Sequence, residues 1–455
     1  MTDAAEGDEQ HSSQGHVDDH DGGHSHLHEH GVPGGWKAVR SNRVLQAVLA
    51  FVVVAALATA VGVIALWPGD NASEAVAENA AAMGLTSDRF SATVDGVVEQ
   101  PCSYSTSERL QQCRLVTFLV DDGPDAGQVV SIPEINIEFD LAIPDLVIGD
   151  QVILGYEPST DFYFYNDRDR RASLVWLAVL FAVVVIALGR FRGVFALLAM
   201  ALTLVILVAF VAPAVLAGQD PLLVAVVAAA LIALISLYLT HGFTPTTTVA
   251  LAGTLGALGL TLGLSWLFFE LAQFTGFATE ETLLLPLVAE ELDVGALLLG
   301  GAIIGALGAL DDVTVTQVST VAELRHRSPT LPTTELVASG IRVGRDHIAS
   351  TVNTLLLAYA GASMPLLLLF AVSNQSLDIV ANSELIGVEI VRTLAGSVGL
   401  VAAVPITTVL AAAVLRPAGD TPDDPHEQPE PDPESAQPPS IERAPEWDDF
   451  APNEN

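Results

Sequence analysis

Two adjacent carboxylates, Asp311 and Asp312, follow a glycine-rich apolar run that begins at Gly295. A carboxylate can bind a cation or carry a proton. An acid at the centre of a bilayer costs about 2.5–3.5 kcal/mol, so such residues face protein or water and often mark ion or proton pathways. Thr316 and Glu323 follow Asp312 at helical spacing, which places these side chains on one helix face. The sequence therefore predicts a polar helix face at the end of an apolar segment.

A second polar run, "GRDHIASTVNTLLLAYAG", begins at residue 344. Asp346 and Asn353 recur on one helical face, and His347 lies one step from it. We expect this helix to rise from the cytoplasm, so its polar residues lie at about the depth of the two aspartates. The two faces predict an inward-facing cavity, an ion or proton pathway lined by Asp311, Asp312, Thr316, Asp346, His347 and Asn353. In the alternative, the aspartates are a wet helix end, and the hydroxyl and amide side chains hold helices together.

A third polar cluster lies in the last apolar run, "GVEIVRTLAGSVGLVAAVPITT". Glu389 and Arg392 are three residues apart, a spacing that allows an ion pair within one helix. We interpret them as a structural pair toward the outer side of the membrane. Pro405 in the same run permits a kink.

The elements that must position these residues are membrane spans. Hydrophobic residues make up 51% of the 455-residue chain and charged residues 16%. Runs of about 20 apolar residues are long enough to cross a bilayer. We predict a polytopic helical membrane protein, with an anchor at residues 44–67 and a seven-helix bundle at 172–416. The eight expected spans are residues 44–67, 172–189, 193–217, 221–239, 247–271, 295–310 with a polar extension, 347–372 and 387–415.

Basic residues orient the predicted spans. Lys37, Arg40 and Arg43 precede the first span, and positively charged flanks remain in the cytoplasm. With eight spans, both termini are cytoplasmic, and we expect a bacterial-type plasma membrane. The cluster Arg168, Arg170 and Arg171 lies on the outer side and is the exception. Pro329 and Pro332 predict a break, and we interpret the following segment, which carries Arg342 and Arg345, as a short interfacial helix.

The segment 68–171 is expected outside the cell. Short runs of alternating apolar and polar residues, separated by Asp, Gly and Pro, are typical of strands. They predict an inserted β-rich domain, a small barrel or sandwich of about five strands. Cys102 and Cys113 lie in this segment, and a disulfide suits an oxidising compartment. Two free thiols or a weak metal pair are the alternatives.

The two tails, residues 1–43 and 417–455, are polar and low in complexity, which predicts disorder. The first tail contains His24, His26, His28 and His30, interleaved with other residues. Imidazole and carboxylate groups together bind divalent transition metals, so weak metal binding by this tail is expected. We expect no other cofactor.

Composition and motifs also exclude function classes. The net charge is −36, and there is no basic face that would hold phosphates, so nucleic acid is not an expected partner. Neither an H-E-x-x-H zinc motif nor a G-x-S-x-G nucleophile elbow occurs. We therefore do not expect an enzyme.

Three motifs together, "GALGALDDVTVTQVSTVAEL", "GRDHIASTVNTLLLAYAG" and "EIVRTLAGSVGLVAAVPITT", resemble the YibE/F family of bacterial integral membrane proteins. The order of an anchor helix, an outer β-rich segment and a helical bundle is also similar, over roughly residues 44–416. The resemblance implies this architecture and a permease-like role. It carries no catalytic residues.

Two functions follow as hypotheses. In the first, the chain is a permease that moves an ion or a small solute past the intramembrane carboxylates, with the lipid bilayer as its surroundings. In the second, it is a membrane scaffold or sensor that does not transport, and its outer β domain binds a protein partner of the cell envelope.

Overall fold

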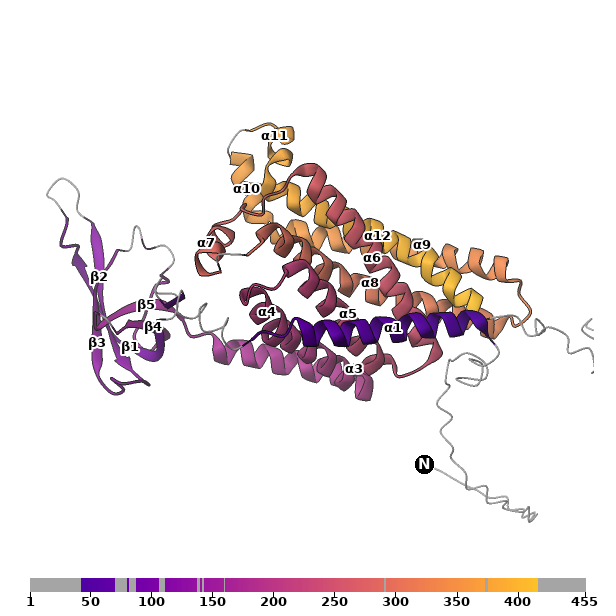
Figure 1. Cartoon of the computed structure of the whole chain (residues 1–455). Helices are drawn as coiled ribbons and strands as arrows, with labels where there is room; N and C mark the ends of the chain where they lie inside the picture. The colour runs from indigo at the N-terminus through magenta and orange to yellow at the C-terminus, as the bar shows by residue number, and fades with distance from the viewer. Residues whose placement is uncertain are drawn as a thin grey trace, which may run out of the picture.

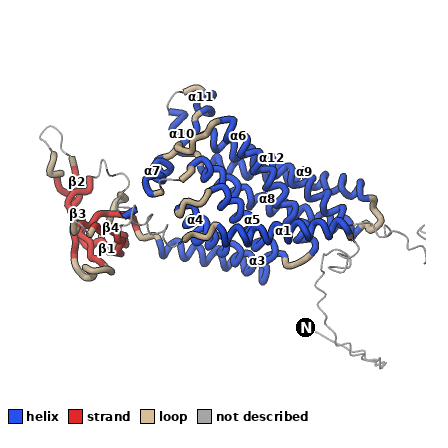
Figure 2. Tube along the Cα trace, in the orientation of Figure 1, coloured by secondary structure: helices blue, strands red, loops and turns tan. Residues whose placement is uncertain are grey.

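The structure is a computed structural model that describes most of the chain between Asn42 and Leu415. A β-sheet lies at one end of a long helical bundle, and α1 begins at the opposite end (Figure 1). Figure 2 separates the two regions by secondary structure. The predictions for the tails, including the metal-binding histidines, lie outside the described residues. The described residues are 42–69, 80–81, 87–105, 111–136, 140, 143–158, 160–289, 292–372 and 375–415.

The helical region consists of long apolar helices joined by short turns. Six helices are long and apolar enough to cross a membrane, or seven if α9 and α10 form one bent span. This indicates a multi-pass membrane protein, while the count of eight spans stays a prediction. The helices are α1 (Arg43–Ala65), α3 (Arg171–Ile206), η2 (Leu207–Val211), α4 (Ala212–Leu216), α5 (Pro221–His241), α6 (Pro245–Ala272), α7 (Glu280–Val288), α8 (Val294–Arg327), α9 (Thr333–Ala362), α10 (Met364–Val372), α11 (Leu377–Asn382) and α12 (Glu384–Val414).

α3 is not one straight helix. Arg190 has a non-helical backbone, with φ 51° and ψ −129°. A Cβ built on Gly193 would lie 2.3 Å from the carbonyl oxygen of Val185. Eight residues of a straight helix would separate these positions by about 12 Å. The chain therefore folds back on itself at Arg190, which divides α3 into two apolar segments.

α9 differs from the sequence prediction. The interfacial helix expected near Arg342 and the span expected from His347 are one continuous helix, Thr333–Ala362. No proline interrupts it, and Gly340 and Gly344 let it pack closely: a Cβ on Gly344 would lie 2.5 Å from Cγ1 of Val404 on α12. The predicted short interfacial helix was wrong. The break lies instead between α9 and α10, which meet at 62°.

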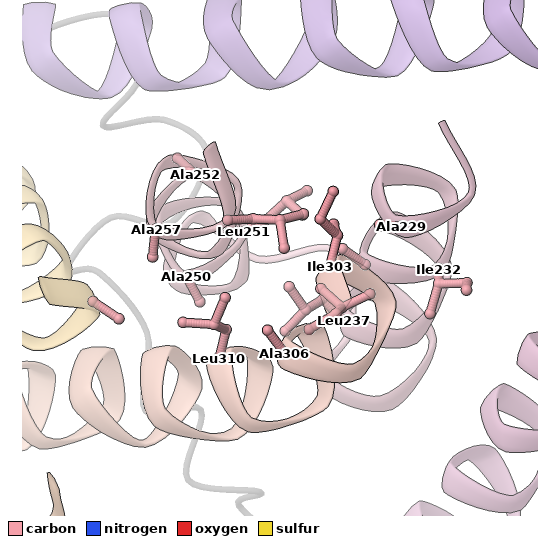
Figure 3. Packing of buried hydrophobic residues seen from close by; sticks show 14 of the residues in the cluster. Ala229, Ile232, Leu237, Ala250, Leu251, Ala252, Ala257, Ile303, Ala306 and Leu310 are labelled. Atoms are coloured by element: carbon pink, nitrogen blue, oxygen red, sulfur yellow. The ribbon is translucent and has the colours of Figure 1, made fainter. Parts of the chain in front are cut away.

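The core of the bundle forms where α5, α6 and α8 meet (Figure 3). Small residues allow close approach here. A Cβ on Gly300 of α8 would lie 2.7 Å from Cβ of Ala225 on α5. In contrast, Cβ positions at Gly259, Gly263 and Gly301 would have no atom within 4 Å. Spaced glycines in the sequence therefore do not by themselves identify the helix contacts.

Hydrogen bonds hold the start of α1 and the end of α8 against the end of α12. The amide of Asn42, which also caps α1, donates to the carbonyl of Val414 at 2.8 Å. Nε of the buried Arg325 donates to the carbonyl of Leu415 at 2.9 Å. The first and last described residues of the helical region therefore lie at the same end of the bundle.

The strands between α1 and α3 form one antiparallel, curled sheet with the order β3-β2-β1-β4-β5. A turn with Gly149 at φ 93° leads into β4. The last strand, β5, pairs along β4 and begins with four aromatic residues, "FYFY". The strands are β1 (Asp88–Pro101), β2 (Gln112–Val120), β3 (Val129–Asn136), β4 (Gln151–Glu157) and β5 (Phe162–Arg168).

The sheet is fastened at both ends. Cys102 and Cys113 form a disulfide between the ends of β1 and β2. At the start of α3, Arg171 pairs with Asp169 at 2.6 Å and also donates to the hydroxyl of Ser91 on β1 at 2.8 Å. Two further arginines lie at the junction between sheet and bundle: Arg168 pairs with Asp150, and Arg170 pairs with Asp167.

Candidate functional site

α8 is the central helix of the candidate site. It packs against α5, α6, α9 and α12. The polar extension expected after Leu310 continues the same helix to Arg327 without a break. A 34-residue helix is about 50 Å long. Its polar residues divide into two groups that face opposite environments.

The first group, the sealed side of α8, makes hydrogen bonds to neighbouring helices. The hydroxyls of Thr314 and Thr254 on α6 are 2.6 Å apart, and both residues are buried. The buried Gln317 donates through Nε2 to the carbonyl of Gly340 on α9 at 2.9 Å and to the hydroxyl of Thr408 on α12 at 2.6 Å. These groups are helix-packing contacts, as the alternative interpretation of the hydroxyls proposed.

The second group, the open stripe of α8, is exposed. Its members recur every three or four residues, so they share one face of the helix. The N-terminal half of the stripe consists of glycines, and the C-terminal half consists of polar residues. The open stripe consists of Gly301, Gly305, Gly308, Asp312, Thr316 and Ser319.

The two adjacent aspartates point in different directions. Oδ2 of Asp311 accepts a hydrogen bond from the hydroxyl of Ser236 on α5 at 3.2 Å. Its Oδ1 is buried, and no donor within the described chain reaches it. Asp312 lies on the open stripe, with 72% of its side chain exposed. The pair therefore does not form one two-carboxylate site.

Asp312 faces α9. Its Oδ2 lies 4.0 Å from Nε2 of His347, and this imidazole nitrogen has no hydrogen-bond partner among the described residues. A separation of 4.0 Å is too long for a hydrogen bond. It is short enough for a protonated imidazole to attract the carboxylate. The structure thus brings together the acid of one polar run and the histidine of the other.

The remaining predicted residues are placed separately. Thr316 lies one turn beyond Asp312 on the open stripe. Asp346 and Asn353 are exposed on α9, and in the described part of the chain neither forms a hydrogen bond or ion pair with α8. They extend the polar surface next to the stripe without completing a cluster.

The position of Ser236 shows where Asp311 and Asp312 lie along the length of the bundle. This residue lies five positions before the end of α5 at His241, or about 8 Å along the helix axis. Asp311 beside it is therefore level with the last turns of α5, at the end of the bundle where α1 begins. Near the other end of the bundle, Glu389 and Arg392 form an ion pair at 2.7 Å.

Tyr359 belongs to this second cluster and was not predicted from the sequence. Leu355 of α9 lies 3.7 Å from a Cβ built on Gly396 of α12. The two helices run in opposite directions, so Tyr359, one turn after Leu355, is level with Arg392. A Cβ on Gly305 would lie 3.0 Å from the Tyr359 hydroxyl. The open stripe therefore leads from Asp312 toward this second cluster.

A family model for YibE/F-like proteins matches residues 177–417, more than half of the chain. The chain belongs to the YibE/F family. No curated protein and no solved structure matches it. The matched region of this YibE/F chain contains α8, α9 and α12, and thus both polar clusters, whereas α1 and the sheet lie outside the match.

A cofactor or metal site in the YibE/F chain would need several ligands in one place. Within residues 42–415, as far as the structure describes them, no group of three or more His, Cys, Asp and Glu side chains could hold a metal ion. Asp312 and His347 provide two such groups. They are suited to a proton or a transient ion rather than to a structural metal.

The sheet of the YibE/F chain carries a separate hollow at its surface. Arg114 lies in its wall and bonds to Glu99 at 3.1 Å and to Asp145. On β5, burial and a hydrogen bond to Asp125 raise the pKa of Tyr163 above its ordinary value. The hollow is lined by Arg114, Val116, Ile135, Asp140, Ile143, Pro144, Asp145 and Leu146.

Proposed function

We propose that this protein is a permease that moves an ion or a small solute across a membrane along the open stripe of α8. The observation that carries the proposal is the approach of Asp312 and His347, from two different helices, on an exposed polar face within long apolar helices. Exposed ionisable groups in such helices normally face a water-filled path. At Gly301 and Gly308 an added Cβ would meet no atom within 4 Å, so these glycines of the stripe leave room for a solute beside the helix.

The proposal includes eight membrane crossings with both termini in the cytoplasm of a bacterial-type cell. The fold-back at Arg190 supports counting α3 as two crossings, and α9 with α10 supplies one bent crossing. An even number agrees with the contact between Asn42 and Val414, which joins the two ends of the helical region. Asp312 and His347 then lie near the inner end of the path.

In the proposed transport mechanism the two aspartates have different roles. Asp312 and His347 exchange a proton or bind the passing ion, because a carboxylate and an imidazole can each hold a proton or bind a cation. Asp311 bonds to Ser236 and positions α8 against α5. Replacement of its carboxylate by an amide keeps an acceptor for Ser236, so Asp311→Asn should fold.

Flux into proteoliposomes tests the proposal, with protons, divalent cations and small organic ions as probes. Asp312→Asn should lower flux by about tenfold or more, since a charge-assisted interaction contributes about 1.5–3 kcal/mol. His347→Gln should act in the same direction, and Asp311→Asn should have a smaller effect. Glu335→Gln, an exposed carboxylate at the start of α9, is the control and should leave flux unchanged.

Full flux in Asp312→Asn would contradict this site assignment. Absence of flux for every probe would favour the second candidate, a scaffold or sensor whose sheet binds an envelope protein. The hollow beside Arg114 is the observation that favours it. Capture of one defined envelope protein by the full chain, lost in Arg114→Glu, would support that function.

A further inference from the structure

We infer that the edge of the Arg392 guanidinium formed by Nε and Nη2 is a binding site for an oxyanion. We also infer that the solute carried by this protein bears such a group. The inference rests on the proposed permease function and adds the chemical class of its substrate. The site consists of Arg392 and Glu389 on α12, with Tyr359 of α9 at the same level.

The hydrogen bonds of Arg392 leave one edge of the guanidinium without a partner. Nη1 donates to Oε1 of Glu389 at 2.7 Å. Nε is buried, and among the described residues no group accepts a hydrogen bond from it. Nε and Nη2 lie on the same edge of the planar group, which is the edge that binds a carboxylate or phosphate through two parallel hydrogen bonds.

An ion pair alone does not account for this arrangement. A Glu and a basic residue three positions apart on one helix stabilise it only slightly. A buried donor without an acceptor costs more free energy than such a pair contributes. The side chain of Arg392 is only 19% exposed. The cost of burying Nε therefore exceeds the gain from the pair, and an oxyanion acceptor would offset it.

The position of Arg392 links it to the path. Tyr359 is level with Arg392 and its hydroxyl lies against Gly305 on the open stripe. Gly305 precedes Asp312 by seven residues, or about 10 Å along α8. A solute that leaves Arg392 thus enters the stripe toward Asp312 and His347.

Charge balance narrows the substrate further. Glu389 neutralises Arg392, so a bound oxyanion leaves this cluster with a net negative charge. A proton carried by Asp312 or His347 in the same direction would compensate for it. The predicted substrate is therefore a small carboxylate or phosphate that moves together with a proton.

The test is direct binding of acetate, lactate and inorganic phosphate to the purified full chain, measured by calorimetry in an uncharged detergent. We expect binding to the wild type and a loss of about tenfold or more in Arg392→Lys, because lysine keeps the charge for Glu389 but cannot form two parallel bonds. Arg342→Gln, at an exposed arginine of α9, should bind as the wild type does. Thermal unfolding of each variant checks folding, and Arg392→Lys should retain the wild-type midpoint.

A lipid phosphate is the other source of an oxyanion, and nanodiscs distinguish it. Binding of lactate or phosphate in nanodiscs that contain phosphatidylglycerol, lost in Arg392→Lys, supports the inference. Binding of phosphatidylglycerol alone, lost in Arg392→Lys, would overturn the substrate assignment. Equal binding of free oxyanions to wild type and to a folded Arg392→Lys would overturn the site.

The inference and the permease function can fail separately. Oxyanion binding that depends on Arg392, without flux of any oxyanion, would contradict the permease and the substrate class but keep the site. Flux of cations that depends on Asp312, without any oxyanion binding, would keep the permease and overturn the inference.

Discussion

The sealed side and the open stripe of α8 use similar residues for different purposes. On the sealed side, Thr314 and Gln317 are buried and bonded to α6, α9 and α12. On the open stripe, Thr316 and Asp312 are exposed. The two sides alternate along one short run, so neighbouring residues belong to different environments. A polar side chain within an apolar helix therefore does not by itself indicate function. Whether it is bonded to a neighbouring helix or exposed distinguishes a packing role from a functional one.

The largest expected contrast is between two adjacent glycines, one on each side. Gly300→Ala would place a methyl group 2.7 Å from Cβ of Ala225, and the helices must move apart. Overpacking of this kind costs about 1–3 kcal/mol. Gly301→Ala meets no atom within 4 Å, so its stability should equal or exceed that of the wild type, because alanine favours a helix more than glycine. Thermal unfolding in detergent measures both.

Equal destabilisation by Gly300→Ala and Gly301→Ala would contradict the assignment of the two sides. It would mean that Gly301 packs against something, such as a second copy of the chain. Equal and small effects would instead show that α5 and α8 are less tightly packed than their contact indicates.

A smaller contrast is expected at the next pair, Gln317 and Thr316. Gln317→Leu removes two interhelical hydrogen bonds, which contribute about 0.6 kcal/mol each in membrane proteins. It should lower the unfolding midpoint. Thr316→Val should leave the midpoint unchanged and lower flux, because its hydroxyl lies on the proposed path. A reversed pattern, with Thr316→Val destabilised and Gln317→Leu stable, would exchange the roles of the two sides.

The sequence predicted much of the architecture. Apolar runs identified the helices, and alternation within the segment 68–171 predicted a β-rich domain, which contains a five-stranded sheet in the structure. It did not predict that α9 continues through Arg342 and Arg345, because arginines near prolines are typical of a membrane boundary. The close contact of Gly344 with Val404, which supports that continuity, depends on a helix 60 residues away.

The site was predicted in part. Helical spacing placed Asp312 and Thr316 on one face, and the structure brings His347 next to Asp312. Residue spacing could not show that Asp311 and Asp312 have different surroundings. Only the packing of α5 against α8 shows that the Ser236 hydroxyl donates to Asp311. Tyr359 was missed because no charged residue lies near it in the sequence. Its place in the site depends on its neighbours Gly305 on α8 and Arg392 on α12.

The central claim is that the open stripe faces water rather than lipid, and cysteine labelling tests it most directly. The two native cysteines form a disulfide and no described cysteine is free, so single substitutions introduce the one reactive thiol. The variants are Gly308→Cys and Thr316→Cys on the stripe, Thr314→Cys on the sealed side, and Val183→Cys on the exposed apolar surface of α3.

A charged thiol reagent that does not enter lipid is added to the protein in proteoliposomes. We predict labelling of Gly308→Cys and Thr316→Cys, and none of Thr314→Cys or Val183→Cys. If the stripe positions remain as unreactive as Val183→Cys, the stripe faces lipid or another copy of the chain, and the proposed path does not exist.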